Sequence, residues 1–501
     1  MGHAASLEST SDGSEFDSTG LIVALLSAIA TVILYVLTLA PGLGWHDSAE
    51  LSLRAYQLGA THSPGSPLHT VIGHGLILLT DSPAFATNLL SAISMGVAAG
   101  LLALLIRMTS GGWGYAGAFL FACSYEVWTN AVVTELYGPS TLFTLLSSVC
   151  LWIWRSGGRT TWLLAGIIAY CCALGIWFAN LLFLPAIFWL LWIHSQTRVR
   201  DGVLVFALVA LALTCIAAAN LWLSLRVPPF GPDIPESLAG LYRYMSGAMH
   251  EPLAARDLAF YSGRIVEHLL IFSQNFLWVG IPLGLVGLIG YTRAEPAFGG
   301  YLLLLFGIQM TYFTCFGSGD YYSMVMLSYA VFSFWIVCGA KILVNRQSNW
   351  TLIAAGLLAA ILIVQLWQQL PGRWRAAKHS PAQEFVDNSF AVFPENALLV
   401  AGFQQFAALQ YGQVVQGGRP DMEIILPAGT LRHYGRTKVQ NYLDHIAANL
   451  CERPVFTNKV TGELQANYKL LAVAEMAGWF KLEYRESGNS CSGHATNMSG
   501  V

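Results

Sequence analysis

The chain has 501 residues, of which 55% are hydrophobic and only 11% are charged. Soluble domains carry about 25% charged residues, so this composition excludes an ordinary soluble protein. The net charge of −3 is too small to indicate a nucleic-acid partner. Apolar runs of about 20 residues, the length that crosses a bilayer, recur through most of the chain. A polytopic membrane protein surrounded by lipids is therefore predicted.

Three parts are expected in chain order. Residues 1–19 are polar and acidic, which predicts a disordered tail. Residues 20–371 are predicted to form an all-α transmembrane domain of about eleven helices, with residues 66–80 as a short interfacial helix or a re-entrant segment. The expected spans are 20–40, 84–107, 112–129, 136–155, 160–178, 180–194, 202–226, 268–291, 297–316, 322–344 and 350–370.

Residues 372–501 change in character and predict a small α/β domain. Short strands are expected in "ALLVAG", "MEIIL", "PVFTN" and "YKLLAVA", and helices in "AQEFVDNSFAVF" and "LRHYGRTKVQNYLDHIAANL". This part contains no Gly-rich phosphate loop, so no nucleotide site is assigned to it. Cys451 and Cys491 both lie here, and they form a disulfide or stay reduced depending on whether the compartment is oxidising.

The basic residues of the short loops predict the orientation of the chain in the membrane. With the N-terminus in the cytoplasm, nearly every cytoplasmic turn carries a cation, namely Arg107, Arg155, Arg159, Arg198, Arg200, Arg293, Lys341 or Arg346. The extracytoplasmic side then receives the loop after the first span, a long loop at about 227–267, and the C-terminal domain. Residues 1–340 contain no lysine, so the few arginines are the strongly basic side chains of the outer loops in this part of the chain.

The stretch "GWHDSAELSLRAYQLGATHSPGSPL" places several charged groups directly after the first span. On a helix, Asp47 and Glu50 would share a face, and Arg54 would lie one turn beyond Glu50. One interpretation is a capped interfacial helix with a single ion pair, in which Asp47 and Ser48 cap the helix and Glu50 completes the capping box. The other is a functional site, since ionisable residues at membrane depth usually mark function. The rigid turn "HSPGSPL" could then hold His62 against a ligand.

Further polar candidates are expected on the same outer face. They are Glu135 and Tyr137 in "TELYGPS", Asp320 in "FGSGDYYSM", and Arg226 and Arg264 beside the long loop. Each alone is explained more simply as a solvated loop charge or an interfacial anchor. Their gathering on one side of the membrane favours a common site.

The ordered set of motifs resembles the protein O-mannosyltransferase-like membrane enzymes of the GT-C class, the family that includes transmembrane protein 260. That family has an Asp-x-x-Glu after its first span, then His-Pro-Pro-Gly-x-Pro-Leu, an Asn, a Glu-x-Tyr and an "RPD" element. The matching elements here are Asp47 with Glu50, "HSPGSPL", Asn88, Glu135 with Tyr137, and Arg419 to Asp421. The sequence departs from the pattern at Ser63, where a proline is expected, and at Phe230, where a tryptophan is expected.

The resemblance implies a GT-C-like fold and an enzyme that moves a sugar, mannose or another hexose, with inversion. The donor would be a polyprenyl- or dolichyl-phosphate sugar and the acceptor a hydroxyl of a protein Ser/Thr or of a lipid. It implies Asp47 as general base with Glu50 assisting. The donor-phosphate candidates are His62, Arg54, Arg226 and Arg264, and the other substrate-binding candidates are Glu135, Tyr137 and Asp320. No metal is expected from the resemblance, although Asp47 and Glu50 could ligate a divalent cation.

Two other function classes are compatible with the sequence. A transporter or flippase could use membrane-embedded Glu126 and Asp320, although the internal repeats usual in transporters are not seen. A non-catalytic membrane scaffold could bind partners through its C-terminal part. Such a scaffold would tolerate the loss of both Asp47 and Glu50.

Overall fold

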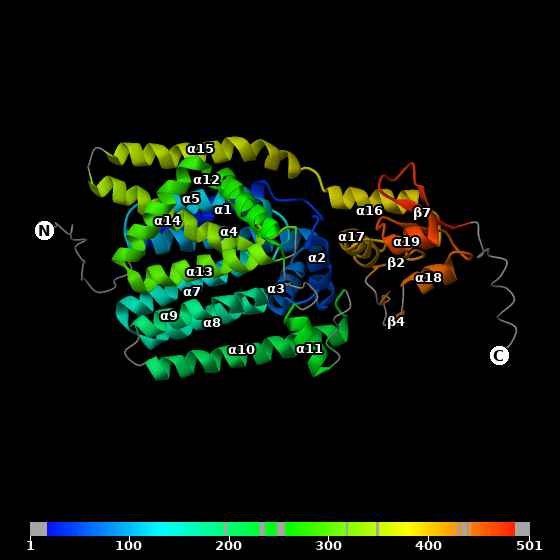
Figure 1. Cartoon of the computed structure of the whole chain (residues 1–501), viewed down its shortest axis with the longest axis horizontal. Helices are drawn as coiled ribbons and strands as arrows, with labels where there is room; N and C mark the ends of the chain where they lie inside the picture. Colours follow the sequence, from blue (N-terminus) through cyan, green and yellow to red (C-terminus); the bar gives the residue numbers. More distant parts are fainter. Residues whose placement is uncertain are drawn as a thin grey trace.

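The chain folds into a bundle of helices followed by a small domain built on a mixed β-sheet (Figure 1). The structure is a computed structural model that describes residues 18–194, 198–230, 235, 237–247, 256–316, 319–346, 350–427, 431–432, 438–439 and 442–485. Most of the predicted N-terminal tail lies outside these residues, and the first helix begins at Ser18.

The predicted spans coincide with helices, although their ends differ by several residues. Among the described residues, seven helices are long and apolar enough to cross a membrane, namely α1 (Ser18–Leu37), α4 (Pro83–Ser110), α10 (Arg198–Arg226), α12 (Leu258–Ala294), α13 (Pro296–Cys315), α14 (Met326–Arg346) and α15 (Trp350–Ala376). The remaining expected spans fall on α7 (Tyr137–Gly157), α8 (Thr160–Ile176), and the 3₁₀ turn η1 (Phe178–Phe183) followed by α9 (Leu184–His194). Integral, multi-pass membrane character follows from these helices, while the number that crosses the bilayer stays a prediction.

The prediction of one continuous helix at 112–129 was wrong. The segment consists of α5 (Gly114–Ala122) and α6 (Tyr125–Ala131), because Ser124 has an extended backbone. The break leaves carbonyl groups without helical partners inside the bundle. The side-chain amides of Gln365 and Gln369 on α15 donate to the carbonyls of Leu120 and Cys123. One turn further along α15, Arg373 donates to the Thr129 hydroxyl of α6.

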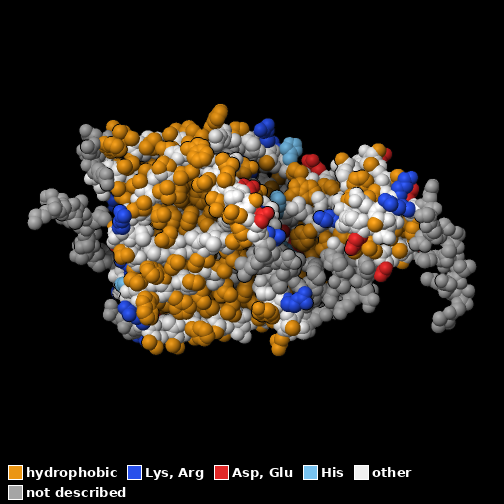
Figure 2. Space-filling model, in the orientation of Figure 1, with side chains coloured by type: hydrophobic (Ala, Val, Ile, Leu, Met, Phe, Trp, Pro, Cys, Tyr) orange, Lys and Arg blue, Asp and Glu red, His pale blue; other side chains and the backbone are white. Residues whose placement is uncertain are grey.

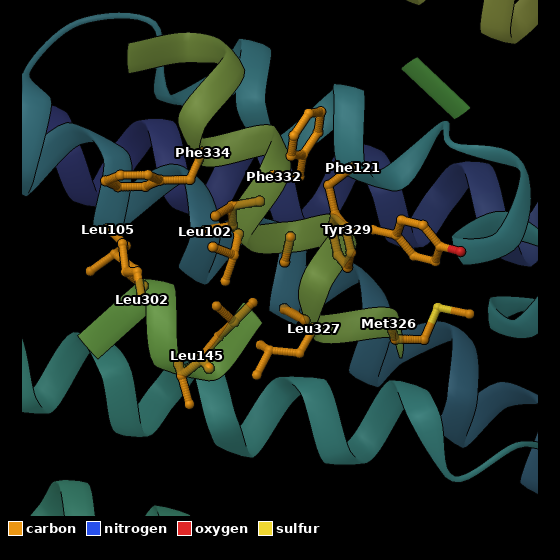
Figure 3. Close-up of a cluster of buried hydrophobic side chains, with 14 of the residues drawn as sticks. Leu102, Leu105, Phe121, Leu145, Leu302, Met326, Leu327, Tyr329, Phe332 and Phe334 are labelled. Carbon is orange, nitrogen blue, oxygen red and sulfur yellow. The ribbon is translucent and has the colours of Figure 1, made fainter. Parts of the chain in front are cut away.

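A hydrophobic core fills the bundle between these helices. Figure 3 shows Leu102 and Leu105 of α4, Leu145 of α7, Leu302 of α13 and Phe332 of α14 converging on one cluster of buried side chains. Large apolar side chains of α1, α10, α12 and α15 instead face outward, and Figure 2 shows that hydrophobic side chains cover much of the bundle surface. An outer surface of this kind suits contact with lipid.

The C-terminal domain contains a five-stranded sheet with the order β2-β1-β5-β7-β6. β1 (Leu398–Val400) pairs in parallel with both β2 (Glu423–Ile425) and β5 (Val455–Thr457). β7 (Phe480–Tyr484) is antiparallel to both β5 and β6 (Tyr468–Ala472). The helices of the domain are α16 (Pro381–Val392), α17 (Phe403–Val414), α18 (Tyr442–Asn449) and α19 (Gly462–Asn467). The short strands expected from the sequence are therefore confirmed, and β7, α17 and α19 are additional.

The predicted start of one helix in this domain was wrong. Instead of starting at Leu431, the helix α18 starts at Tyr442, and β3 (Leu431–Arg432) pairs with β4 (Lys438–Val439) in an antiparallel manner. Gly435 and Val439 both lower the helix propensity of this stretch, which explains the difference. Cys451 is disulfide-bonded. Cys491 lies outside the described residues, so its pairing with Cys451 stays a prediction.

The boundary between bundle and domain is less sharp than expected. Helix α15 continues through Pro371 to Ala376. One hydrophobic cluster contains Leu43 and Leu53 of the bundle together with Phe406 and Trp479 of the domain. The domain predicted at 372–501 therefore packs directly on the loop and helix that follow α1.

The "RPD" element holds parts of the domain together and is not among the described residues that line the cavity discussed below. The Arg419 guanidinium donates to both carboxylate oxygens of Asp421, at 2.9 and 2.8 Å. It also donates to the backbone carbonyls of Phe390, Phe393 and Pro394 at the end of α16. A guanidinium suits this task because its planar fork donates in several directions at once.

Candidate active site

The site is built around α2 (Ser48–Gln57), the helix that follows the first span. Asp47 lies at the N-cap position, but its side chain makes no capping hydrogen bond. The predicted capping box was therefore wrong. The carboxylates of Asp47 and Glu50 both approach His62 instead, which favours a site over a capped interfacial helix.

Glu50 fixes His62 through both of its carboxylate oxygens. One oxygen accepts the backbone N–H of His62 at 2.7 Å, and the other lies 2.5 Å from the imidazole Nδ1. The imidazole Nε2 lies 3.8 Å from the nearer carboxylate oxygen of Asp47. The Glu50 side chain is fully buried, whereas that of Asp47 remains 33% exposed. His62 thus lies between a buried acid and an acid that a ligand can reach.

The two acids control the charge of His62. Burial by itself lowers the pKa of an imidazole, but the neighbouring carboxylates of Glu50 and Asp47 outweigh it and raise the pKa of His62 to about 10. His62 is therefore an imidazolium at neutral pH. Burial raises the pKa of Asp47 above its usual value, His62 opposes that rise, and Glu50 and Asp320 add to it. Asp47 consequently has a higher affinity for a proton than an ordinary surface carboxylate.

The turn that carries His62 is fixed by a neighbouring helix. The Ser63 hydroxyl donates to the backbone carbonyl of Tyr244, at 2.5 Å, in α11 (Leu238–Met245). The Tyr244 hydroxyl in turn donates to the carbonyl of Thr61, at 2.7 Å. Gly65 has a φ of +85°, and a Cβ there would lie 2.5 Å from the Asn220 side-chain oxygen. Ser63, which departs from the family pattern, therefore has a defined role in holding the turn.

Asp47 and His62 open onto a cavity of about 1340 Å³ that lies between the bundle and the C-terminal domain. Its polar lining also includes Glu135, Tyr137 and Asp320, which the sequence had singled out. Much of the remaining lining is apolar, with Trp177, Phe178, Leu181, Leu213, Met245 and Phe313 among its residues. Trp177 stacks on Phe313 with ring centroids 5.3 Å apart. The cavity can therefore accept a ligand with a polar group and a long apolar part.

Glu135 is the most deeply buried acid of the lining. Burial, and then the charges of Asp47 and Asp320, raise its pKa well above the usual value. Its backbone is fixed because its N–H donates to the Ser91 hydroxyl, which itself donates to the Glu135 carbonyl. The raised pKa favours the protonated form of Glu135, which can donate a hydrogen bond to a ligand oxygen.

The arginines proposed from the sequence are not among the described residues that line the cavity. The Arg54 guanidinium is buried and lies 3.9 Å from the ring centroid of Phe230. Arg226 lies over Trp222, and Arg264 lies 3.5 Å from the ring centroid of Tyr321. These cation–π contacts point each guanidinium at an aromatic ring rather than at the cavity.

Sequence reasoning missed the wall that the C-terminal domain contributes. Its lining residues follow the carboxyl ends of the parallel strands β1, β2 and β5, namely Gly402, Phe403, Gln404, Leu426, Pro427 and Lys459. Phe403 makes an edge-on contact with the His62 ring, with centroids 5.4 Å apart. Their positions directly after predicted strands could have identified these residues, because ligands often bind beyond the carboxyl ends of parallel strands.

The described part of the chain contains no group of three or more His, Cys, Asp or Glu residues placed to hold a metal ion. Asp47 and Glu50, which could have shared a cation, are both directed at His62 instead.

Comparison with known proteins gives a consistent assignment. Residues 47–200 match the family model described as the protein O-mannosyl-transferase TMEM260 N-terminal domain. Over this segment the chain is similar to the TMEM260 family. The matched segment begins at Asp47 and includes Glu50, His62, Glu135 and Tyr137, so the TMEM260 domain contains most of the predicted site.

Two relatives named TMEM260 are each matched over only part of their own length. The protein O-mannosyl-transferase tmem260 of Dictyostelium discoideum is 22% identical over 466 residues, which cover 80% of this chain and 56% of that protein. The protein O-mannosyl-transferase TMEM260 of Mus musculus is 31% identical over 160 residues, which cover 31% of this chain and 22% of that protein. The chain therefore spans about half the length of the first relative and matches a smaller share of the second.

Solved structures support the fold. ArnT from Cupriavidus metallidurans bound to undecaprenyl phosphate aligns with a TM-score of 0.56 at 11% identity, covering 94% of this chain and all of ArnT. ArnT in the apo state aligns with a TM-score of 0.55 at 12% identity, covering 93% of this chain and 98% of ArnT. The predicted GT-C-like helical fold with a small C-terminal domain is thus confirmed.

Proposed function

We propose that this protein is a membrane glycosyltransferase that moves a sugar from a polyprenyl-phosphate carrier to a hydroxyl group. The observation that carries the proposal is the pairing of Asp47 with His62 on the lining of a cavity of about 1340 Å³ that is otherwise largely apolar. A lipid-linked sugar has the matching character, since its sugar and phosphate are polar and its prenyl chain is apolar.

Asp47 acts as the general base in this proposal. It takes the proton of the acceptor hydroxyl as the hydroxyl oxygen forms a bond to the anomeric carbon of the sugar. The bond between that carbon and the phosphate oxygen breaks, and the polyprenyl phosphate leaves with the electron pair. Attack from the face opposite the leaving group inverts the anomeric centre.

His62 and Glu50 position and charge the base. The positive imidazolium of His62 favours the ionised form of Asp47 against the effect of burial. Glu50 is a positioning residue, because it holds the imidazole through Nδ1 and the backbone N–H. Glu135 and Tyr137 lie on the same lining and are proposed to hydrogen-bond the substrate.

The names of the relatives favour particular substrates. Both are called protein O-mannosyl-transferases, which supports mannose as the sugar and a protein Ser or Thr hydroxyl as the acceptor. The ArnT structure with undecaprenyl phosphate supports a polyprenyl-phosphate carrier. Dolichyl phosphate shares this chemistry.

The proposed orientation places the N-terminus in the cytoplasm and the cavity and C-terminal domain on the extracytoplasmic side. Contacts between residues assigned to the cytoplasmic turns support it. Arg155 at the end of α7 pairs with Glu295 at the end of α12, and Lys341 donates to the carbonyl of Ser110. The end of α9 and the start of α10 lie at the end of the bundle away from the C-terminal domain (Figure 1).

The test is sugar transfer by purified protein from a defined polyprenyl-phosphate mannose to Ser/Thr peptides, read by mass spectrometry. Asp47→Asn should reduce transfer by about 10²–10⁴-fold, the usual contribution of a general base. Asp81→Asn is the matched control, because Asp81 is exposed and outside the cavity lining. Full activity of Asp47→Asn would remove Asp47 as the base, and lipid or solute flux without covalent transfer would favour a transporter.

A further inference from the structure

The proposed reaction requires a cation at the donor phosphate, and this inference rests on that proposed function. Negative charge develops on the phosphate as the sugar leaves, and a preorganised cation stabilises it. The family resemblance implies His62 and three outer arginines as the groups that bind the donor phosphate. In the structure, none of these four residues is placed to supply the cation at the donor phosphate.

None of these four groups is well placed to supply free positive charge. Arg54, Arg226 and Arg264 lie over aromatic rings and are not among the described lining residues. His62 reaches the cavity, but its imidazolium lies between the carboxylates of Glu50 and Asp47. Its charge is therefore compensated within the site.

Lys459 is the one lysine or arginine among the described residues that line the cavity. Its side chain is exposed, and it makes no ion pair within the described part of the chain. Residues 1–340 contain no lysine, so an ammonium group in this cavity has to come from the last third of the chain. The compact ammonium of a lysine is a common ligand for phosphate.

The backbone at Lys459 is held firmly. The Lys459 N–H donates to the Thr457 hydroxyl at 3.1 Å, and that hydroxyl donates to the Val400 carbonyl of β1 at 3.0 Å. The neighbouring Asn458 side chain accepts the backbone N–H of Gly402 at 2.8 Å. The turn after β5 is thus tied to the end of β1, and the root of the lysine side chain has a fixed place at the cavity rim.

We propose that Lys459 contacts the phosphate of the lipid-linked donor. The C-terminal domain then supplies the positive charge for the leaving group, opposite the acids that the bundle supplies. Donor binding is divided between the two parts of the chain, with the prenyl group against the bundle and the phosphate against the domain.

The test is binding of radiolabelled decaprenyl phosphate and, in parallel, of decaprenol to the purified full-length protein in detergent. The comparison isolates the phosphate from the prenyl chain. Lys459→Met should weaken binding of the phosphate by about 10–100-fold, the range for a hydrogen bond to a charged group, and leave decaprenol binding unchanged. Lys459→Arg should retain most of the phosphate affinity, and Lys469→Met on β6 should match the unsubstituted protein.

The outcomes separate the inference from the proposed function. A wild-type protein that binds both lipids equally would contradict the proposed function itself. A wild-type preference for the phosphate that persists in Lys459→Met would overturn the role of Lys459. Equal weakening of both lipids would also overturn it, because it would indicate a structural role. A higher Michaelis constant for the peptide with unchanged lipid binding would assign Lys459 to the acceptor and overturn the proposal as well.

Discussion

The two walls of the cavity differ in how they are held and in the chemistry they carry. The bundle wall carries the acids Asp47 and Glu135 and is fixed by the fully buried carboxylate of Glu50. The domain wall carries Gln404 and Lys459, and its ties at Lys459 and Asn458 are hydrogen bonds of turns that are partly exposed. In the proposed reaction, the wall fixed by Glu50 transfers the proton, and the wall that carries the long, exposed Lys459 side chain recognises the phosphate.

The largest expected effect is on the bundle wall. Glu50→Ala leaves the His62 imidazolium without its buried partner, and breaking a buried pair in this way costs about 3–5 kcal/mol. Unfolding monitored in detergent should show a large loss of stability together with a loss of transfer. Glu463→Ala in α19 is the control, since Glu463 is exposed. Equal stability of the two variants would mean that the bundle wall is no more rigidly fixed than the domain wall.

A smaller effect is expected within the C-terminal domain, which supports the second wall. Arg419→Met removes the pair with Asp421 and three hydrogen bonds to the end of α16. The pair is partly exposed and screened by solvent, so we expect a loss of about 1–2 kcal/mol. Protease sensitivity should rise in the C-terminal domain alone. Cleavage spreading into the bundle would show that the two walls unfold as one unit.

The apolar lining provides a third comparison. Trp177→Ala removes the ring that stacks on Phe313, which should weaken binding of a long prenyl phosphate by about tenfold, or 1.4 kcal/mol. Binding of a short-chain phosphate should change much less. An equal loss for both chain lengths would mean that Trp177 contacts the polar part of the donor.

The smallest expected effect is a shift in pH dependence. Asp47 must be ionised to act as base, and its pKa is raised by burial, so activity should increase with pH through a pKa above the usual aspartate value. His62→Gln removes a positive charge that lowers the pKa of Asp47, so the rising limb should move to higher pH. The measurement is transfer rate against pH for both proteins. A shift to lower pH would contradict the pairing of His62 with Asp47.

Much of the bundle was predictable because lipid imposes a length and an apolar composition on every helix that crosses it. The break between α5 and α6 was not, because it depends on Gln365 and Gln369, which lie far along the chain. The strands of the C-terminal domain were predictable from short apolar runs. Its packing on α2 was not, since local patterns contain no information on which surfaces meet.

The site was predictable in its residues more than in their contacts. Asp47, Glu50 and His62 were found by motif, but helical spacing paired Glu50 with Arg54. In the structure both oxygens of Glu50 reach His62, and Arg54 lies over Phe230 from a distant loop. Lys459 was missed because it belongs to none of the motifs recognised in the sequence, and only the folding of the sheet brings it to the cavity.

Three polar side chains on one face of α15 fix the position of this helix along the bundle. Gln365, Gln369 and Arg373 are four residues apart, and each donates to a group at the α5–α6 break. A slide of α15 by one residue, about 1.5 Å, would separate all three donors from their acceptors, and the next equivalent position lies a full turn of about 5.4 Å away. Only residues 377–380 separate α15 from α16, so a step of α15 along the bundle would carry α16 and the C-terminal domain with it.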